Sequence, residues 1–287
     1  MQLATWSKDG TTTFGVVGDD GALFDIARRA NGQFTDLAAV VRTNAAEAVS
    51  RLAKGAPDGH LHDVTLLPPL PRPGKIICVG VNYPERNAEY KDGSEEPKFP
   101  SLFVRFPSSL VGHQAAIVRP PESEQLDYEG EIVIIIGKAG RRIAERDARA
   151  HIFGLTLMNE GSVRDWIRHG KFNVTQGKNF ERSGAVGPWI VPLDPSINLD
   201  DLVVTTRVNG HERQRGNTGT LMFPFARIIA YISTFTTLEP GDMIATGTPP
   251  GAGGRFDPPK WLKAGDVVDV SCDAIGTLSN TVTDEAA

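Results

Sequence analysis

The stretch LDYEGEIVIII, residues 126–136, places two glutamates at the start of a run of five β-branched residues that predicts a buried strand. Side chains alternate between the two faces of a strand, so Glu129 and Glu131 point the same way, with Cα atoms about 6.5–7 Å apart. Two like charges beside such a run are costly to bury unless a cation or protons neutralise them. The pair therefore indicates a metal ion, and a third acid is expected close by.

Residues 154–160, GLTLMNE, supply that third acid, because this second short apolar strand ends on Glu160. No Cys or His stands at ligand spacing here, and oxygen ligands favour Mg²⁺ or Mn²⁺, with Ca²⁺ also accommodated, over zinc. The spacing alone equally allows Glu129 and Glu131 to lie on the solvent-exposed face of an edge strand, since exposed pairs of acids are common.

Composition and charge narrow the class of protein. The chain has 287 residues and a net charge of −5, and it lacks clusters of Lys and Arg, which argues against nucleic acid as a partner. The first residues have no signal-peptide core, and no apolar run approaches a membrane span, so no membrane association is expected. Cys78 and Cys272 have apolar or small neighbours and are predicted to be buried thiols in a reducing compartment. We expect a cytoplasmic protein.

A proline-rich segment, residues 66–74, predicts a boundary between two domains. We expect a small N-terminal α/β domain over residues 1–70 and a larger domain over residues 71–287. In the first, Asp-Gly turns separate strands expected at residues 2–6, 12–17 and 22–26. One helix is predicted over residues 36–52, with Asp36 as its cap and Gly55 beyond its end.

The larger segment is predicted to be mostly β, which makes the whole chain α+β. One helix is expected near residues 224–234, with Ile228, Ile229 and Ile232 on one face. The strands are expected at residues 75–79, 101–105, 116–118, 129–136, 153–158, 189–191, 203–208, 243–246, 267–272 and 275–283. Residues 245–254 form a loop of small residues whose backbone amides suit an anion, although a plain connection between strands explains the loop equally well.

Seven motifs along the larger segment occur in a characteristic order, and over residues 74–283 the chain resembles the fumarylacetoacetate hydrolase superfamily. The motifs are Gly80-Val81-Asn82-Tyr83 followed by Glu89, Phe103-Val104-Arg105, Asp127-Tyr128-Glu129-Gly130-Glu131, Asn159-Glu160-Gly161-Ser162-Val163-Arg164-Asp165, Gly177-Lys178-Asn179-Phe180, Gly187-Pro188-Trp189, and Leu238-Glu239-Pro240-Gly241-Asp242 with Thr246-Gly247-Thr248-Pro249.

This resemblance implies a catalytic domain built as a mixed β-sandwich roll, a homodimer, and one Mg²⁺ or Mn²⁺ ion held by Glu129, Glu131 and Glu160. The implied substrate is a small oxo acid, whose oxygens chelate the ion while the ion stabilises an enolate. Charged and loop residues at matching positions are expected in the site. Lys178 and Arg164 are the expected catalytic cations, and the expected substrate-binding residues are Arg86, Arg105, Tyr83, Thr248 and Gly247.

The chain departs from the pattern of this superfamily at four positions. Glu160 replaces the usual aspartate ligand, Arg105 replaces a lysine, and Ile167 replaces a glutamine. At the fourth position Arg86 replaces the histidine that deprotonates water in hydrolytic members, and arginine does not act as a base at physiological pH. Together, Arg86 and Arg105 suggest a substrate that carries a negative charge at the end that does not bind the metal ion.

Hydrolysis would therefore need a substitute base, because a missing general base costs about 10² to 10⁴ in rate. Glu85, Glu89 and His113 are the three candidates.

The sequence is compatible with three functions. Our first expectation is a metal-dependent hydrolase that cleaves a C–C bond of a 2,4-dioxo acid such as an acylpyruvate. The second is a lyase or isomerase of the same fold, such as a 2-oxo acid decarboxylase, tautomerase or hydratase, which needs the enolate but no activated water for cleavage. The third is a protein that binds a metal and an oxo acid without catalysis.

Overall fold

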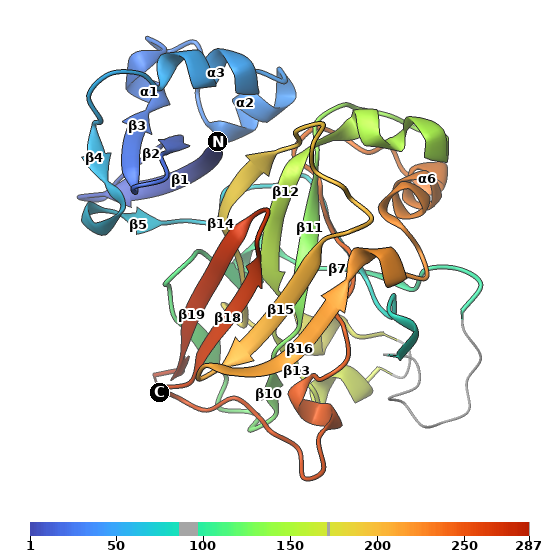
Figure 1. Cartoon of the computed structure of the whole chain (residues 1–287). Helices are drawn as coiled ribbons and strands as arrows, with labels where there is room; N and C mark the ends of the chain where they lie inside the picture. Colours follow the sequence, from blue (N-terminus) through green and yellow to red (C-terminus); the bar gives the residue numbers. More distant parts are fainter. Residues whose placement is uncertain (86–96, 171–172, 287) are drawn as a thin grey trace.

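The computed structural model describes residues 1–85, 97–170 and 173–286, and two large β-sheets form its framework (Figure 1). The twelve-stranded sheet contains β1 (Gln2–Lys8), β2 (Thr11–Val17), β3 (Ala22–Asp25), β4 (Gly59–His60), β5 (Thr65–Leu66), β6 (Ile76–Val79), β7 (Leu102–Val104), β8 (Leu110–Val111), β11 (Gly130–Ile136), β12 (Ile152–Asn159), β14 (Gly184–Pro192) and β17 (Met243–Ala245). The five-stranded sheet contains β9 (Ile117–Arg119), β15 (Val203–Val208), β16 (His211–Asn217), β18 (Val267–Cys272) and β19 (Gly276–Asp284).

The described residues also contain a third, small sheet, five α-helices and the 3₁₀ helices η1 (Leu61–Asp63), η2 (Pro107–Ser109), η3 (Glu145–His151), η4 (Trp166–Arg168), η5 (Thr218–Thr220) and η6 (Gly253–Arg255). The strands β10 (Leu126–Asp127) and β13 (Ser162–Val163) form a two-stranded sheet. The α-helices are α1 (Ile26–Arg29), α2 (Leu37–Arg42), α3 (Ala46–Leu52), α5 (Thr175–Lys178) and α6 (Phe225–Phe235). The predicted α+β, mostly β class is thus confirmed. In the described residues, no helix is long and apolar enough to cross a membrane.

The apolar run of β11 is buried on both faces, which explains why it shows no alternation of polar and apolar residues. On one face, Ile132 and Ile134 pack into a core shared with Val268 and Val270 of the five-stranded sheet. On the other face, Val133, Ile135 and residues of β12 and β14 pack into a second core, which also contains residues of the N-terminal strands and helices.

Pairing of β11 with its neighbours brings the acids together. The antiparallel register sets Gly130 opposite Asn159, and the Glu160 N–H donates to the Glu129 carbonyl oxygen at 2.7 Å. On the other edge of β11, Val133 lies opposite Ala245 of β17, which brings the following loop towards Glu131. Gly130 itself has no room for a side chain, because a Cβ there would lie 2.0 Å from Thr206 Oγ1 of β15.

The N-terminal strands continue the sheet of the larger segment. Leu3 of β1 lies opposite Ile190 of β14, and Figure 1 shows the N-terminal helices α2 and α3 above β1 and β2. The division at residues 66–74 stays a prediction, because a shared sheet and core do not by themselves decide whether the two parts fold separately.

Two sequence expectations about elements are corrected. The helix predicted over residues 36–52 is two helices, α2 and α3, because Asn44 adopts φ 50° between them. Its predicted cap is present, since the Asp36 side chain accepts from the Ala39 N–H. The strand β16 was not predicted; its sequence is polar, but the Asn209-Gly210 turn before it, with φ of 52° and 77°, is a strong hairpin signal.

Candidate active site

Three buried carboxylates form a cluster where β11 begins and β12 ends. Glu129, Glu131 and Glu160 are at most 4 % exposed, and one carboxylate oxygen from each lies within 4.8 Å of the others. The expectation that these acids come together is confirmed, and the alternative of an exposed edge strand is excluded.

Two cations contact this cluster. Lys178, at the end of α5, places Nζ 2.5 Å from Glu129 Oε2 and 3.0 Å from Glu160 Oε2. Arg164, which follows β13, reaches Glu129 Oε1 with its Nη2. Both cations are therefore beside the acids, as the resemblance implies, and Glu129 is shared between them.

Burial and neighbouring charges shift the pKa values of Glu131 and Lys178. Burial, followed by the charges of Glu160 and Glu129, raises the pKa of Glu131 well above its ordinary value, although Lys178 and the Gly247 N–H act in the opposite direction. Burial lowers the pKa of Lys178, but the charges of Glu129 and Glu160 outweigh it, so the pKa is raised and the ammonium form is retained.

The donor set fits a hard divalent cation. Within the described part of the chain, the buried Glu160 Oε1 has no hydrogen-bond partner, which is costly for a carboxylate oxygen away from water. Three carboxylates with one such free oxygen are the kind of ligand set that Mg²⁺ or Mn²⁺ prefers.

The loop after β17 closes one side of the cluster. The Gly247 N–H donates to Glu131 Oε2 at 2.8 Å, and the Thr248 hydroxyl donates to the Gly130 carbonyl oxygen at 3.1 Å. Gly247 is required there, because φ is 103° and a Cβ would lie 2.7 Å from that of Asn82. In this structure both Gly247 and Thr248 therefore support the acid-bearing strand.

Gln214 of β16 is a site-supporting residue that the sequence reasoning missed. It is 1 % exposed; its Oε1 accepts from the Gly130 N–H at 3.0 Å, and its Nε2 donates to Thr248 Oγ1 at 2.8 Å. It therefore links the acid-bearing strand to the loop. Recognising the Asn209-Gly210 hairpin would have drawn attention to this strand.

A cavity of about 340 Å³ opens beside the acids. Glu129, Glu160, Arg164 and Lys178 line its charged end, while its other walls include apolar residues such as Ile167. A small organic acid would fit this volume and would meet both cations.

The remaining predicted residues lie in different places. Tyr83 is buried, and burial raises the pKa of its hydroxyl. Arg105 is also buried, but it donates to the Gly161 carbonyl oxygen at 2.9 Å and to the hydroxyls of Ser109 and Ser183, so it supports the turn after Glu160 and is not among the cavity-lining residues.

Of the three candidate bases, the two that the structure describes, Glu85 and His113, do not belong to the acid cluster. Glu85 is exposed. The Nδ1 of His113 accepts from the Ser279 N–H of β19 at 3.1 Å, and His113 does not line the cavity. Glu89, like the predicted substrate-binding Arg86, lies outside the described residues.

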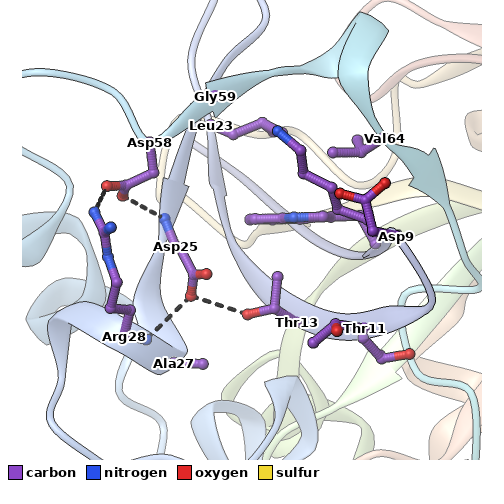
Figure 2. Close-up of a pocket in the computed structure, with 13 residues that line it drawn as sticks. Asp9, Thr11, Thr13, Leu23, Asp25, Ala27, Arg28, Asp58, Gly59 and Val64 are labelled. Carbon is purple, nitrogen blue, oxygen red and sulfur yellow. Dashed lines mark hydrogen bonds and ion pairs between the residues drawn. The ribbon is translucent and has the colours of Figure 1, made fainter.

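A second hollow, of about 530 Å³, lies in the N-terminal part and is shown in Figure 2. Two of its acids already have partners: Asp25 Oδ1 accepts from Thr13 Oγ1 at 2.9 Å and from the Arg28 N–H at 3.0 Å, and Asp58 pairs with Arg28 and Arg29. Although this hollow is larger, it lacks a cluster of buried charges, so the cavity beside Glu129 is the candidate site.

Comparisons with known proteins identify the family that this chain resembles. A family model described as fumarylacetoacetate (FAA) hydrolase, C-terminal, matches residues 75–283. Oxaloacetate tautomerase YisK of Bacillus subtilis (strain 168) is 41% identical over 225 residues, covering 77% of this chain and 74% of that protein. A mitochondrial oxaloacetate tautomerase of Homo sapiens is 40% identical over 222 residues, covering 77% and 70%. The solved structure of a fumarylacetoacetate hydrolase from Exiguobacterium antarcticum has a TM-score of 0.86 and 35% identity, covering 99% of this chain and 100% of that one.

Proposed function

Because the chain belongs to the fumarylacetoacetate hydrolase family, we propose that it is an enzyme that interconverts the enol and keto forms of a small 2-oxo acid, with Mg²⁺ or Mn²⁺ held by Glu129, Glu131 and Glu160. The two similar proteins named oxaloacetate tautomerases support this reaction and make oxaloacetate the first substrate to test. This choice reverses the order of our expectations, in which hydrolysis came first.

One observation carries the proposal: three buried glutamates share a cluster with Lys178 and Arg164 at the end of a small cavity. A divalent ion bound by the glutamates would supply a Lewis acid that stabilises the enolate form of a 2-oxo acid. Lys178 and Arg164 add positive charge at the same end of the cavity, which favours binding of anionic oxygens.

The sequence of the site also suits tautomerisation. Moving a proton between oxygen and carbon requires no activated water for bond cleavage, so the replacement of the usual histidine by Arg86 costs a tautomerase less than a hydrolase.

Cleavage of a 2,4-dioxo acid remains the second candidate, because the Exiguobacterium antarcticum structure of similar fold is named a fumarylacetoacetate hydrolase. The two candidates differ in their products. Tautomerisation leaves the carbon skeleton intact, whereas hydrolysis yields two shorter acids.

The test is to supply enol oxaloacetate and, separately, acylpyruvates to the protein with Mg²⁺ or Mn²⁺. Decay of the enol absorbance and the products by NMR are followed. We expect faster ketonisation of oxaloacetate, lost in Glu160→Gln and kept in Glu145→Gln, which changes an exposed glutamate paired with Arg227. Two shorter acids from an acylpyruvate, without faster ketonisation, would support hydrolysis instead.

A further inference from the structure

Asp127 is a fully buried carboxylate next to the acid cluster that has no role in the reaction as proposed above. Each of its two carboxylate oxygens accepts two hydrogen bonds. Oδ1 accepts from the Tyr128 N–H at 2.8 Å and from the Gly253 N–H at 2.7 Å, and Oδ2 accepts from Arg164 Nε at 2.7 Å and from the Gly254 N–H at 3.0 Å.

The partners of Asp127 reach the acid cluster from two sides. Arg164 is one partner, and its other nitrogen, Nη2, contacts Glu129. Gly253 and Gly254 are the others, and they belong to the same loop as Gly247, whose N–H donates to Glu131. One carboxylate therefore fixes a cation and a loop that each contact a different member of the cluster.

The close fit around Asp127 leaves little freedom for these partners. A Cβ at Gly253 would lie 2.1 Å from the Lys260 carbonyl oxygen and 2.7 Å from Asp127 Oδ1. Burial lowers the pKa of Arg164, but the charges of Glu129 and Asp127 outweigh it, so the guanidinium stays charged between two acids.

We propose that Asp127 is a positioning residue of the active site, which aims Arg164 at Glu129 and clamps the Gly253-Gly254 turn of the site loop. The inference builds on the proposed function, but its main observable is the affinity of the cluster for a divalent ion. Outer contacts that orient ligands commonly change metal affinity or activity about 10- to 100-fold when removed.

A carboxylate is needed here because all four groups that face it are donors. In Asp127→Asn the amide oxygen still accepts, but the amide nitrogen must face either the Arg164 and Gly254 donors or the Tyr128 and Gly253 donors. In either orientation two donors lose their acceptor; in the first, Arg164 is held only by Glu129, and in the second, the Gly253 end of the turn is released.

The first experiment measures Mn²⁺ binding to Asp127→Asn by calorimetry, with kcat and KM for oxaloacetate ketonisation as a second readout. We expect Mn²⁺ affinity about 10- to 100-fold weaker than in the unchanged protein, with kcat reduced in folded, metal-saturated protein.

Asp242→Asn is the matched control. Asp242 is 1 % exposed, accepts from the Lys75 and Glu239 N–H groups at 2.9 and 2.8 Å, and pairs with the Lys75 ammonium at 2.9 Å, so it resembles Asp127 in burial and partners but belongs to another turn. This variant is expected to be less stable yet to keep its Mn²⁺ affinity and kcat.

A double-mutant cycle with Arg164→Lys separates positioning from general stability. If Asp127 acts through Arg164, the combined loss of Mn²⁺ affinity is smaller than the product of the two single losses. Single losses that multiply, or an Asp127→Asn variant that loses thermal stability but binds Mn²⁺ like the Asp242→Asn control, would overturn the proposal. Absence of ketonisation in the unchanged protein would count against the proposed function and leave the Mn²⁺ comparison valid.

Discussion

Glu160 is the acid at which the chain departs from the aspartate that the resemblance leads one to expect. Its Oε2 accepts from Lys178, while its Oε1 is buried without a partner in the described part of the chain. The longer side chain thus still joins the cluster of Glu129 and Glu131.

Two replacements of Glu160 should therefore show how much the charge and the length of its side chain each contribute to metal binding. We expect Glu160→Gln to weaken Mn²⁺ binding by about 100-fold or more, since it removes a charged ligand, and Glu160→Asp to weaken it by about tenfold or less. Calorimetric titration of the metal-free variants gives both numbers. Equal Mn²⁺ affinity in Glu160→Gln and the unchanged protein would show that this residue is not a ligand.

His113 gives a prediction about pH. Burial lowers the pKa of His113, and Asp269 only partly offsets this. Its Nδ1 accepts from the Ser279 N–H, so the neutral ring suits the folded state. Since the unfolded chain binds the proton more readily, stability is lost as pH falls below the unfolded pKa of about 6.5 towards the lowered folded value.

In His113→Asn the side-chain oxygen keeps an acceptor for the Ser279 N–H but does not titrate. We expect this variant to match the unchanged protein in stability near pH 8 and to lose less stability between pH 7 and 5, by urea unfolding. Its kcat should stay within a factor of a few, because His113 does not line the cavity. A drop of about 100-fold in kcat, at the level of a lost general base, would restore His113 as a candidate base.

The residues of the site differ in how far the sequence alone predicts them. Glu129 and Glu131 follow from the two-residue period of a strand beside an apolar run. Lys178 and Arg164 followed only from the resemblance, since isolated cations are usually on the surface. Gln214 could not be placed, because its environment arises from contacts distant in sequence, with Gly130 of β11 and with the loop at Thr248.

At the scale of elements, strong local signals predicted the strands best. The strands β11, β12 and β18 match expectation within one residue or so, because each carries a continuous or alternating apolar pattern. Short strands such as β8 and β13 owe their existence to pairing partners distant in sequence, which a local pattern does not contain.

The break between α2 and α3 is a local feature that was not predicted, because the apolar residues on both sides of it keep a helical spacing. Asn44 has φ 50°, and the Ala45 N–H donates to the Val40 carbonyl oxygen, as at a helix end closed by a left-handed residue. Asn44→Gly should change the free energy of unfolding by less than about 0.5 kcal/mol, whereas Asn44→Ala should destabilise by about 1 kcal/mol. Chemical denaturation checks both; a more stable Asn44→Ala would mean that the solution structure contains one continuous helix.

At the scale of the molecule, the sequence predicts a domain boundary but not the strand pairing that crosses it. The prolines of residues 66–74 marked a boundary, yet β1 pairs with β14 and the second core contains residues from both sides of it. The pairing of Leu3 with Ile190 is invisible to a local pattern. The homodimer, the cytoplasmic location and the two-domain division remain predictions.

Leu3→Ala tests whether the two parts unfold together. Leu3 is fully buried in the core that also contains Val133 and Ile190. Removing its side chain should cost about 2–5 kcal/mol and lower the temperature of a single calorimetric transition. Two separate transitions, with only the first lowered, would instead favour independent domains at the predicted boundary.

The most direct measurement of the central claim is exchange of the C3 protons of oxaloacetate or pyruvate with deuterium, followed by NMR in D₂O with Mg²⁺ or Mn²⁺. Enolate formation at the cluster of Glu129, Glu131 and Glu160 predicts exchange faster than the metal-only rate. In Glu160→Gln the exchange rate should fall to the metal-only rate. Exchange no faster than with the metal alone, in protein shown by calorimetry to be metal-loaded, would contradict enolate chemistry at this site.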